Sequence, residues 1–475
     1  MLYPVYVLGW TRIARWLGFG LSDPKGFLRL VQAMDSLLAA GCCAILFAWV
    51  RSLTDSLKLA LMAALFWALS HAVLLHATNA SEPLAGLFIS LCALSMALLS
   101  IRQARASLMI PAGFLIALAM ASYQSMVFIG MACGFLGLLW PIETTSGDRI
   151  KRALALTISF FVSLGLIYSL CYWLQGIRGI AEAKEAFVAI RAGEAYGGFG
   201  LAKLLNLPIG LTHAIVIAIP HDYEGLRWLL KHPDGWLLRT PVSVLILTSV
   251  AVWAIGRKRS PSAPEWLNAF TIACCSALVL DLLLLLYWDP LYDKLWLQPL
   301  WLSLLLSFTR SAYSVPPSTI AKRALWLMLI VCPAINLWAA VGSARGSWPN
   351  FDEATRVNAV VSPVDYTITE WNSVALLYRQ IWAGDARSFD FPAATCARIS
   401  AGLREMEEGI AATRARGGQV YFLGTLDLDR SAWDSFLGGR CGVPYKTLQP
   451  YRDRARTIAT FQSDGRIITL KRLDP

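Results

Sequence analysis

Apolar runs of membrane-spanning length recur through residues 1–343 and constrain the fold more than any other feature. A bilayer core of about 30 Å requires about 20 consecutive apolar residues in a helix. Only 15% of the 475 residues are charged and 56% are hydrophobic, whereas soluble domains are about 25% charged. The sequence therefore predicts an all-α polytopic membrane protein and excludes a disordered chain. The expected spans are residues 28–50, 58–76, 83–101, 153–175, 238–255, 266–287, 295–309 and 324–343.

Residues 108–140 are too long for one span, and the polar residues 122–125 interrupt their middle. We expect two short helices that form a hairpin there. Cytoplasmic loops carry an excess of Lys and Arg. The loops with clustered cations all fall on one side of the membrane only if residues 108–140 cross the membrane twice. About ten spans result, with both chain ends outside the cytoplasm. The same rule explains the net charge of +11, so nucleic acid is not an expected partner.

The start of the chain fits this topology poorly. Residues 1–10 are apolar, but they lack the basic segment and the cleavage site of a signal peptide. Residues 1–27 look like a segment that follows an earlier helix, so we expect a helix and an external loop before Met1. The alternative is a first segment, residues 1–20, that inserts or re-enters.

Two regions lie outside the expected spans. Residues 1–343 form the transmembrane domain, which includes an external loop at 176–237, and residues 344–475 form a C-terminal extracytoplasmic domain. In this second domain the patterns predict a small α/β fold. Its expected elements are a helix at 394–416, a strand at 419–423, and a hairpin of 457–462 with 467–471.

Cys396 and Cys441 are the two cysteines of the C-terminal domain. An oxidising compartment would permit a disulfide between them. Two free, buried thiols are an alternative that the sequence favours equally.

A first polar cluster lies at the external turn before residues 83–101. It contains His76, Asn79, Ser81 and Glu82, which could bind a metal ion or a phosphorylated head group, or position an acceptor hydroxyl. The alternative is a helix start in which Ser81 caps the helix and Glu82 favours its dipole.

A second external cluster follows residues 266–287. Asp289 and Asp293 lie beside Lys294 and the rings of Tyr292 and Trp296. Aromatic rings stack on sugar faces, and a lysine can neutralise a lipid phosphate. The alternative is an interfacial aromatic belt with a solvated ion pair. Both clusters are expected on one side of the membrane, which favours a shared site.

Further candidates come from two other segments. Tyr123 and Gln124 cap the expected hairpin and could face the same cavity. His221 and Asp222, in the long external loop, join His76 and Glu82 as candidate metal ligands, although a solvated helix start is the simpler explanation for His221 and Asp222. The sequence has no phosphate-binding loop of the Walker type, no HExxH and no CxxC. An ATP-driven pump, a kinase and a cytoplasmic nucleotide-sugar enzyme are therefore not expected.

The order of these features resembles the GT-C superfamily of membrane glycosyltransferases, especially the bacterial relatives of protein O-mannosyltransferases and aminoarabinose transferases. The resemblance is carried by Leu2–Val5, Ala77–Glu82, Ala121–Gln124 and Trp288–Trp296. It implies inverting transfer of a sugar from a polyprenyl-phosphate donor to an extracytoplasmic glycan, lipid or protein, in a bacterial inner membrane. The family's catalytic acid lies in the first external loop, so the main base is expected to be absent from this chain.

The resemblance also implies roles for individual residues. Glu82 would bind the acceptor or a metal, Lys294 would contact phosphate, and Asp289 or Asp293 would orient the sugar or an ion. Tyr292 and Trp296 would flank the lipid head group. No cofactor is expected with certainty, and a divalent metal is the one candidate. A transporter or flippase for a lipid-linked glycan and a non-catalytic membrane scaffold remain as alternative functions.

Overall fold

A computed structural model describes most of the chain, and its described residues form two compact units. The first unit is Met1–Leu174 with Gly197–Ala344, and the second is Gln175–Tyr196 with Arg345–Pro475. The described residues are 3–18, 24–78, 82–140, 145–174, 178–180, 198–216, 263–314, 319–344, 356–369, 387–397, 399–438, 442–463 and 466–474.

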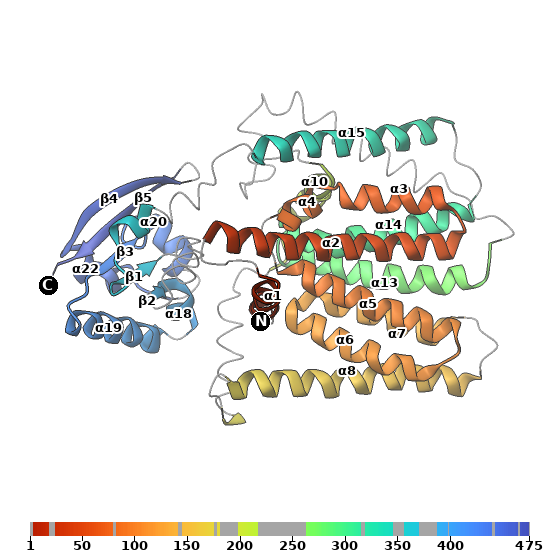
Figure 1. Ribbon diagram of the computed structural model, residues 1–475, viewed down its shortest axis with the longest axis horizontal. Coiled ribbons are helices and arrows are strands. Elements are labelled where there is room, and N and C mark those ends of the chain that lie inside the picture. The colour runs from red at the N-terminus through yellow and green to blue at the C-terminus, as the bar shows by residue number, and fades with distance from the viewer. Residues whose placement is uncertain are drawn as a thin grey trace. The chain divides into compact units, whose positions relative to one another are not determined.

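The first unit is helical (Figure 1). Its helices are α1 Tyr3–Trp16, α2 Pro24–Thr54, α3 Leu57–Ala68, α4 His71–Thr78, α5 Pro83–Arg102, α6 Met109–Ser122, α7 Val127–Leu139, α8 Ser146–Leu174, α10 Leu201–Ile215, α13 Trp266–Tyr287, α14 Leu297–Ala312 and α15 Thr319–Ala344. Short 3₁₀ helices are η1 Ala106–Leu108, η2 Gln124–Met126 and η3 Asp293–Trp296. The long helices pack side by side, with α6 between α5 and α8, and α13 against α7.

Four of the described helices are long and apolar enough to cross a membrane. They are α2 from Arg29 onward, α5, α8 and α13; the bent pair α3 and α4 makes five if it counts as one span. These findings fit a helical membrane protein, but they do not confirm the expected total of about ten spans. Residues 295–309 and 324–343 are helical in α14 and α15, where the apolar stretch Trp326–Trp338 is short. Residues 238–255 lie outside the described residues.

The hairpin expected at 108–140 is present as α6 and α7. Tyr123 ends α6 because its backbone is extended, with φ −153° and ψ 115°. The expected span at 58–76 is different, since it breaks between α3 and α4 with a bend of 58°. At the break the Leu69 carbonyl accepts a hydrogen bond from Asn336 Nδ2 at 2.7 Å, and Ser70 Oγ donates to the Trp67 carbonyl.

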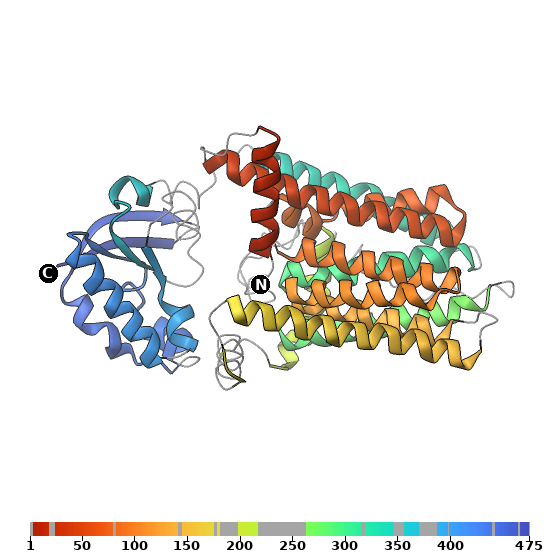
Figure 2. The same cartoon turned by 60° about the horizontal axis from the view of Figure 1, so that its bottom comes forward.

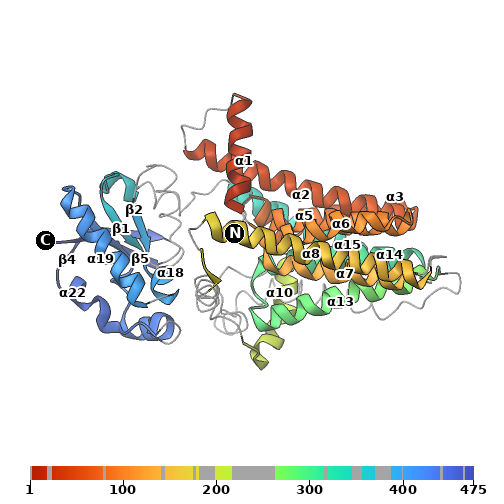
Figure 3. The ribbon, with the colours of Figure 1, turned by 90° about the horizontal axis from the view of Figure 1, so that it is seen from below.

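Helix α8 lies along α6 at one side of the helical unit, as Figure 2 and Figure 3 show. The approach is close because Gly113 has no side chain. A Cβ added to Gly113 would lie 2.4 Å from the Leu156 carbonyl oxygen. Only 6% of the most apolar window of α8 is buried within the protein. Most of its apolar surface is therefore available to lipid.

The second unit contains a five-stranded mixed sheet. Its strands lie in the order β2-β1-β3-β5-β4. β1 pairs in parallel with β2 and β3, and β5 pairs in antiparallel with β3 and β4. The strands are β1 Tyr366–Thr369, β2 Arg387–Asp390, β3 Val420–Leu423, β4 Ala455–Ser463 and β5 Arg466–Leu473.

Helix α18 (Phe391–Ala397) and helix α19 (Ile399–Ala415) lie between β2 and β3 in the chain. Since β2 and β3 run parallel to each other on either side of β1, they need such a crossover connection. Met406 of α19, Phe422 of β3 and Trp433 of the short helix α20 (Arg430–Trp433) belong to one buried core. The strand and the hairpin expected from the sequence are confirmed, whereas the helix expected at 394–416 is divided between α18 and α19. The small sheet confirms the α/β character of this region.

Candidate functional site

The site is built where three segments distant in sequence, α4, α10 and η3, contact one another. Helix α10 approaches the turn before η3 through Gly210. A Cβ there would lie 1.9 Å from the Pro290 carbonyl oxygen and 2.9 Å from Trp296 Nε1, so this contact excludes a side chain. Trp296 Nε1 donates a hydrogen bond to the same carbonyl at 2.7 Å. His213, one turn further along α10, is thereby held beside η3.

Asn336 of α15 ties the break between α3 and α4 to α10. Its Nδ2 donates to the carbonyl oxygens of Leu69 at 2.7 Å and Ile215 at 2.8 Å. Leu69 lies two residues before His71, and Ile215 lies two residues after His213. One buried amide therefore fixes the main chain next to both imidazoles.

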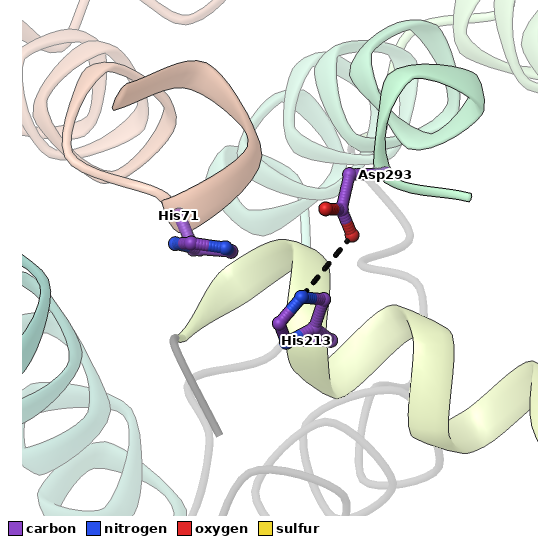
Figure 4. Close-up of side chains that lie close together, drawn as sticks. All are labelled: His71, His213 and Asp293. Atoms are coloured by element: carbon purple, nitrogen blue, oxygen red, sulfur yellow. Dashed lines mark ion pairs between the residues drawn. The ribbon is translucent and has the colours of Figure 1, made fainter. Parts of the chain in front are cut away.

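His71, His213 and Asp293 form a cluster, shown in Figure 4 and called here the His–Asp cluster. His213 Nε2 lies 3.4 Å from Asp293 Oδ1, and the His71 and His213 ring centroids are 4.7 Å apart. The Asp293 side chain is 2% exposed and that of His213 is 7% exposed. A buried carboxylate requires compensating positive charge, which an imidazolium or a bound cation can supply.

Lys294 forms a second group with residues from two other segments. Its Nζ lies 3.8 Å from Glu82 Oε2, 4.7 Å from the Tyr292 ring centroid and 5.6 Å from the Tyr123 ring centroid. We call these four residues the Lys294 group. The structure thus brings Glu82 of the first polar cluster and Tyr123 of the hairpin turn to Lys294 and Tyr292 of the second cluster. The Lys294 side chain is 23% exposed, so an anion can reach its ammonium group.

Asp289 and Lys203 shape the turn that follows α13. Lys203 Nζ donates to the carbonyl oxygens of Tyr287 at 2.7 Å and Trp288 at 2.6 Å, and Asp289 Oδ1 accepts from the Leu291 amide at 2.9 Å. Burial lowers the pKa of Lys203, and the Asp289 carboxylate opposes that shift. Lys203 lies in α10, within the segment 176–237 that was expected to be an external loop, and it was not among the site residues expected from the sequence.

The other expected site residues are more dispersed. Gln124 is exposed at the start of η2, and His76 is half-buried on α4. Trp296 is 3% exposed and bonds to Pro290, so its indole supports the turn from inside the protein and is not open to a lipid head group. Asn79, His221 and Asp222 lie outside the described residues. The expected disulfide also lies outside them, because Cys441 and the side chain of Cys396 are not described.

Asp293 was expected in the site from the sequence, whereas His71 and His213 were not. His71 lies in an apolar stretch that also holds His76, and His213 lies alone in another; neither histidine has a spacing typical of metal ligands. The one local signal is the polar pair Ser70-His71 in the middle of an expected span. In comparisons with known proteins, no family model matches the chain and no curated protein matches it significantly.

Proposed function

We propose that this protein transfers a sugar from a polyprenyl-phosphate donor to an extracytoplasmic acceptor, and that the Lys294 group binds the donor. The supporting observation is the position of Lys294, whose ammonium lies beside two tyrosine rings and one carboxylate. An ammonium group binds phosphate as a point charge, and aromatic faces pack against apolar faces of ligands. This combination suits a phosphate that carries a sugar.

In this proposal Lys294 offsets the negative charge that grows on the phosphate as the glycosidic bond breaks. Glu82, whose side chain is 55% exposed, binds the acceptor hydroxyl next to that bond. Transfer to the opposite face of the sugar inverts its anomeric configuration. The proposal includes about ten spans in a bacterial inner membrane and an extracytoplasmic C-terminal domain.

Binding of a bacterial polyprenyl phosphate to the purified protein in nanodiscs tests the first part. Lys294→Ala should weaken binding by roughly 10- to 100-fold, because charge-assisted hydrogen bonds contribute about 1.5–3 kcal/mol. Lys151→Ala is the matched control, since that lysine is 74% exposed on α8. Equal affinity of the Lys294→Ala variant and the native protein would refute the assignment.

Transfer itself is tested in native membranes supplied with their own polyprenyl-linked sugars. Glu82→Gln should abolish the glycosylated product while donor binding persists. Movement of the donor across the membrane without any product would favour the transporter. Full function in both the Glu82→Gln and Lys294→Ala variants, with loss of function on deletion of 344–475, would favour the scaffold.

A further inference from the structure

We propose that His71, His213 and Asp293 bind a divalent transition-metal ion, with Zn²⁺ as the best fit. One ligand atom from each residue lies within 4.8 Å of the other two. The three residues come from α4, α10 and η3, which contact one another. Two imidazoles and one carboxylate are a common set of protein ligands for zinc sites that keep a fourth position open.

The spacing within the pair His213 and Asp293 fits a shared ion better than a direct ion pair. Their closest atoms are 3.4 Å apart, whereas a charge-assisted hydrogen bond between nitrogen and oxygen measures about 2.7–2.9 Å. Two ligands on one tetrahedral zinc, with bonds of about 2.0–2.1 Å, lie about 3.4 Å apart. His71 is half-buried, and a side-chain movement of at most about 1.4 Å brings it to the same spacing.

Burial and charge support the same assignment. The Asp293 carboxylate is 2% exposed, and a dication bound to it would offset the cost of removing it from water. Imidazole nitrogen favours zinc, iron, nickel and copper over magnesium and calcium, which prefer oxygen ligands. The ligand set therefore selects a transition metal, and its open position can accept water or a substrate oxygen.

The main chain around the cluster is fixed before an ion arrives. Asn336 holds the segments next to His71 and His213, and Gly210 sets α10 against the Pro290 carbonyl. Sites supported in this way lose little entropy on binding, and residues behind the ligands usually affect metal affinity. The proposal does not depend on sugar transfer.

Metal content of the full chain tests the proposal directly. The protein is purified in detergent with a streptavidin-binding tag, because a polyhistidine tag would itself bind metal. It is stripped with a chelator, reloaded with Zn²⁺, passed through gel filtration and measured by plasma mass spectrometry. We expect one zinc per native chain, and almost none in the His213→Ala and Asp293→Asn variants.

His76→Ala is the matched control, because His76 lies on the same helix as His71 but outside the cluster. It should retain the ion. Co²⁺ loading adds a readout independent of any activity, since a tetrahedral site gives visible ligand-field bands that the Asp293→Asn variant should lose. Asp293→Asn keeps the side-chain shape, and an unchanged gel-filtration profile shows that the variant is folded.

Two results would overturn the assignment. One is a folded Asp293→Asn variant that retains zinc at the native stoichiometry, and the other is a native protein that takes up no ion. Uptake shared equally by native protein and all variants would mean adventitious surface binding and would also overturn it. None of these results bears on sugar transfer, which is scored by its product.

Discussion

Gly210 provides a sharp test of how α10 positions the site. The Gly210→Ala variant adds one methyl group, whose carbon would start 1.9 Å from the Pro290 carbonyl oxygen. A carbon and an oxygen approach comfortably at about 3.3 Å, so α10 and the turn must separate by about 1.4 Å. Overpacking of this kind costs about 1–3 kcal/mol, and a strained Trp296–Pro290 hydrogen bond adds about 1 kcal/mol.

The same displacement moves His213 relative to Asp293. Their separation of 3.4 Å would rise to as much as about 4.8 Å, which is beyond the spacing of two ligands on one tetrahedral ion. Zinc affinity should then fall about 10- to 100-fold, as when residues behind metal ligands are changed. All three ligands are still present in this variant.

Two assays check this prediction. Thermal unfolding followed by tryptophan fluorescence should show a midpoint several degrees lower, and competition with a chromophoric chelator should show the weaker binding. Gly198→Ala is the control, because a Cβ at Gly198 meets nothing within 4 Å. A Gly210→Ala variant with native midpoint and native affinity would refute the packing argument. A lower midpoint with unchanged affinity would refute only the coupling to the ligands.

Three further predictions concern single side chains. Asn336→Leu removes two hydrogen bonds, so the unfolding midpoint and the zinc affinity should both fall, by about 1 kcal/mol of stability per bond. Arg452→Lys loses a guanidinium that lies 3.9 Å from the Tyr445 ring centroid, so hydrogen exchange in the second unit should accelerate, in line with a loss of about 0.5–2 kcal/mol. Burial raises the pKa of Tyr451 in the folded state, and the Glu407 carboxylate adds to this shift. The stability that the raised pKa contributes is fully present below the unfolded-state pKa of about 10. It is lost as the pH rises through the folded-state pKa. Tyr451→Phe should remove this alkaline loss, measured as unfolding midpoints between about pH 8 and about pH 11.

The predictable parts of the fold are those whose boundaries depend on local sequence. The polar residues 122–125 interrupt an apolar run, and the chain turns there between α6 and α7. The apolar runs bounded by charged residues closely predicted the limits of α2, α5 and α13. The break inside 58–76 was not predicted. Ser70 bonds locally to the Trp67 carbonyl, but the other hydrogen bond at the break comes from Asn336, which is remote in the chain. Strands β1, β2 and β3 have four residues each. A run this short carries a weak pattern, and only β3 was predicted.

The candidate site was also predictable only in part. A site shared by Glu82 and Lys294 was predictable, because the pattern of loop charges predicts that both lie on one side of the membrane. The His–Asp cluster was not accessible, since it depends on how α10 folds back onto η3. This packing is possible because Gly210 has no side chain at the point where α10 meets the Pro290 carbonyl. In a chain with 34 glycines, no local pattern distinguishes that one.

The exposed length of α8 has a mechanical consequence. Its 29 residues correspond to about 44 Å, and the part beyond its cationic first turns, 153–174, to about 33 Å. A hydrocarbon core of about 30 Å accommodates that part at a tilt of about 25°. A thinner bilayer would increase the tilt, and the tight contact at Gly113 would carry the movement into α6. Because α6 ends beside Tyr123, the acyl-chain length of the surrounding lipid would then affect the environment of the Lys294 ammonium.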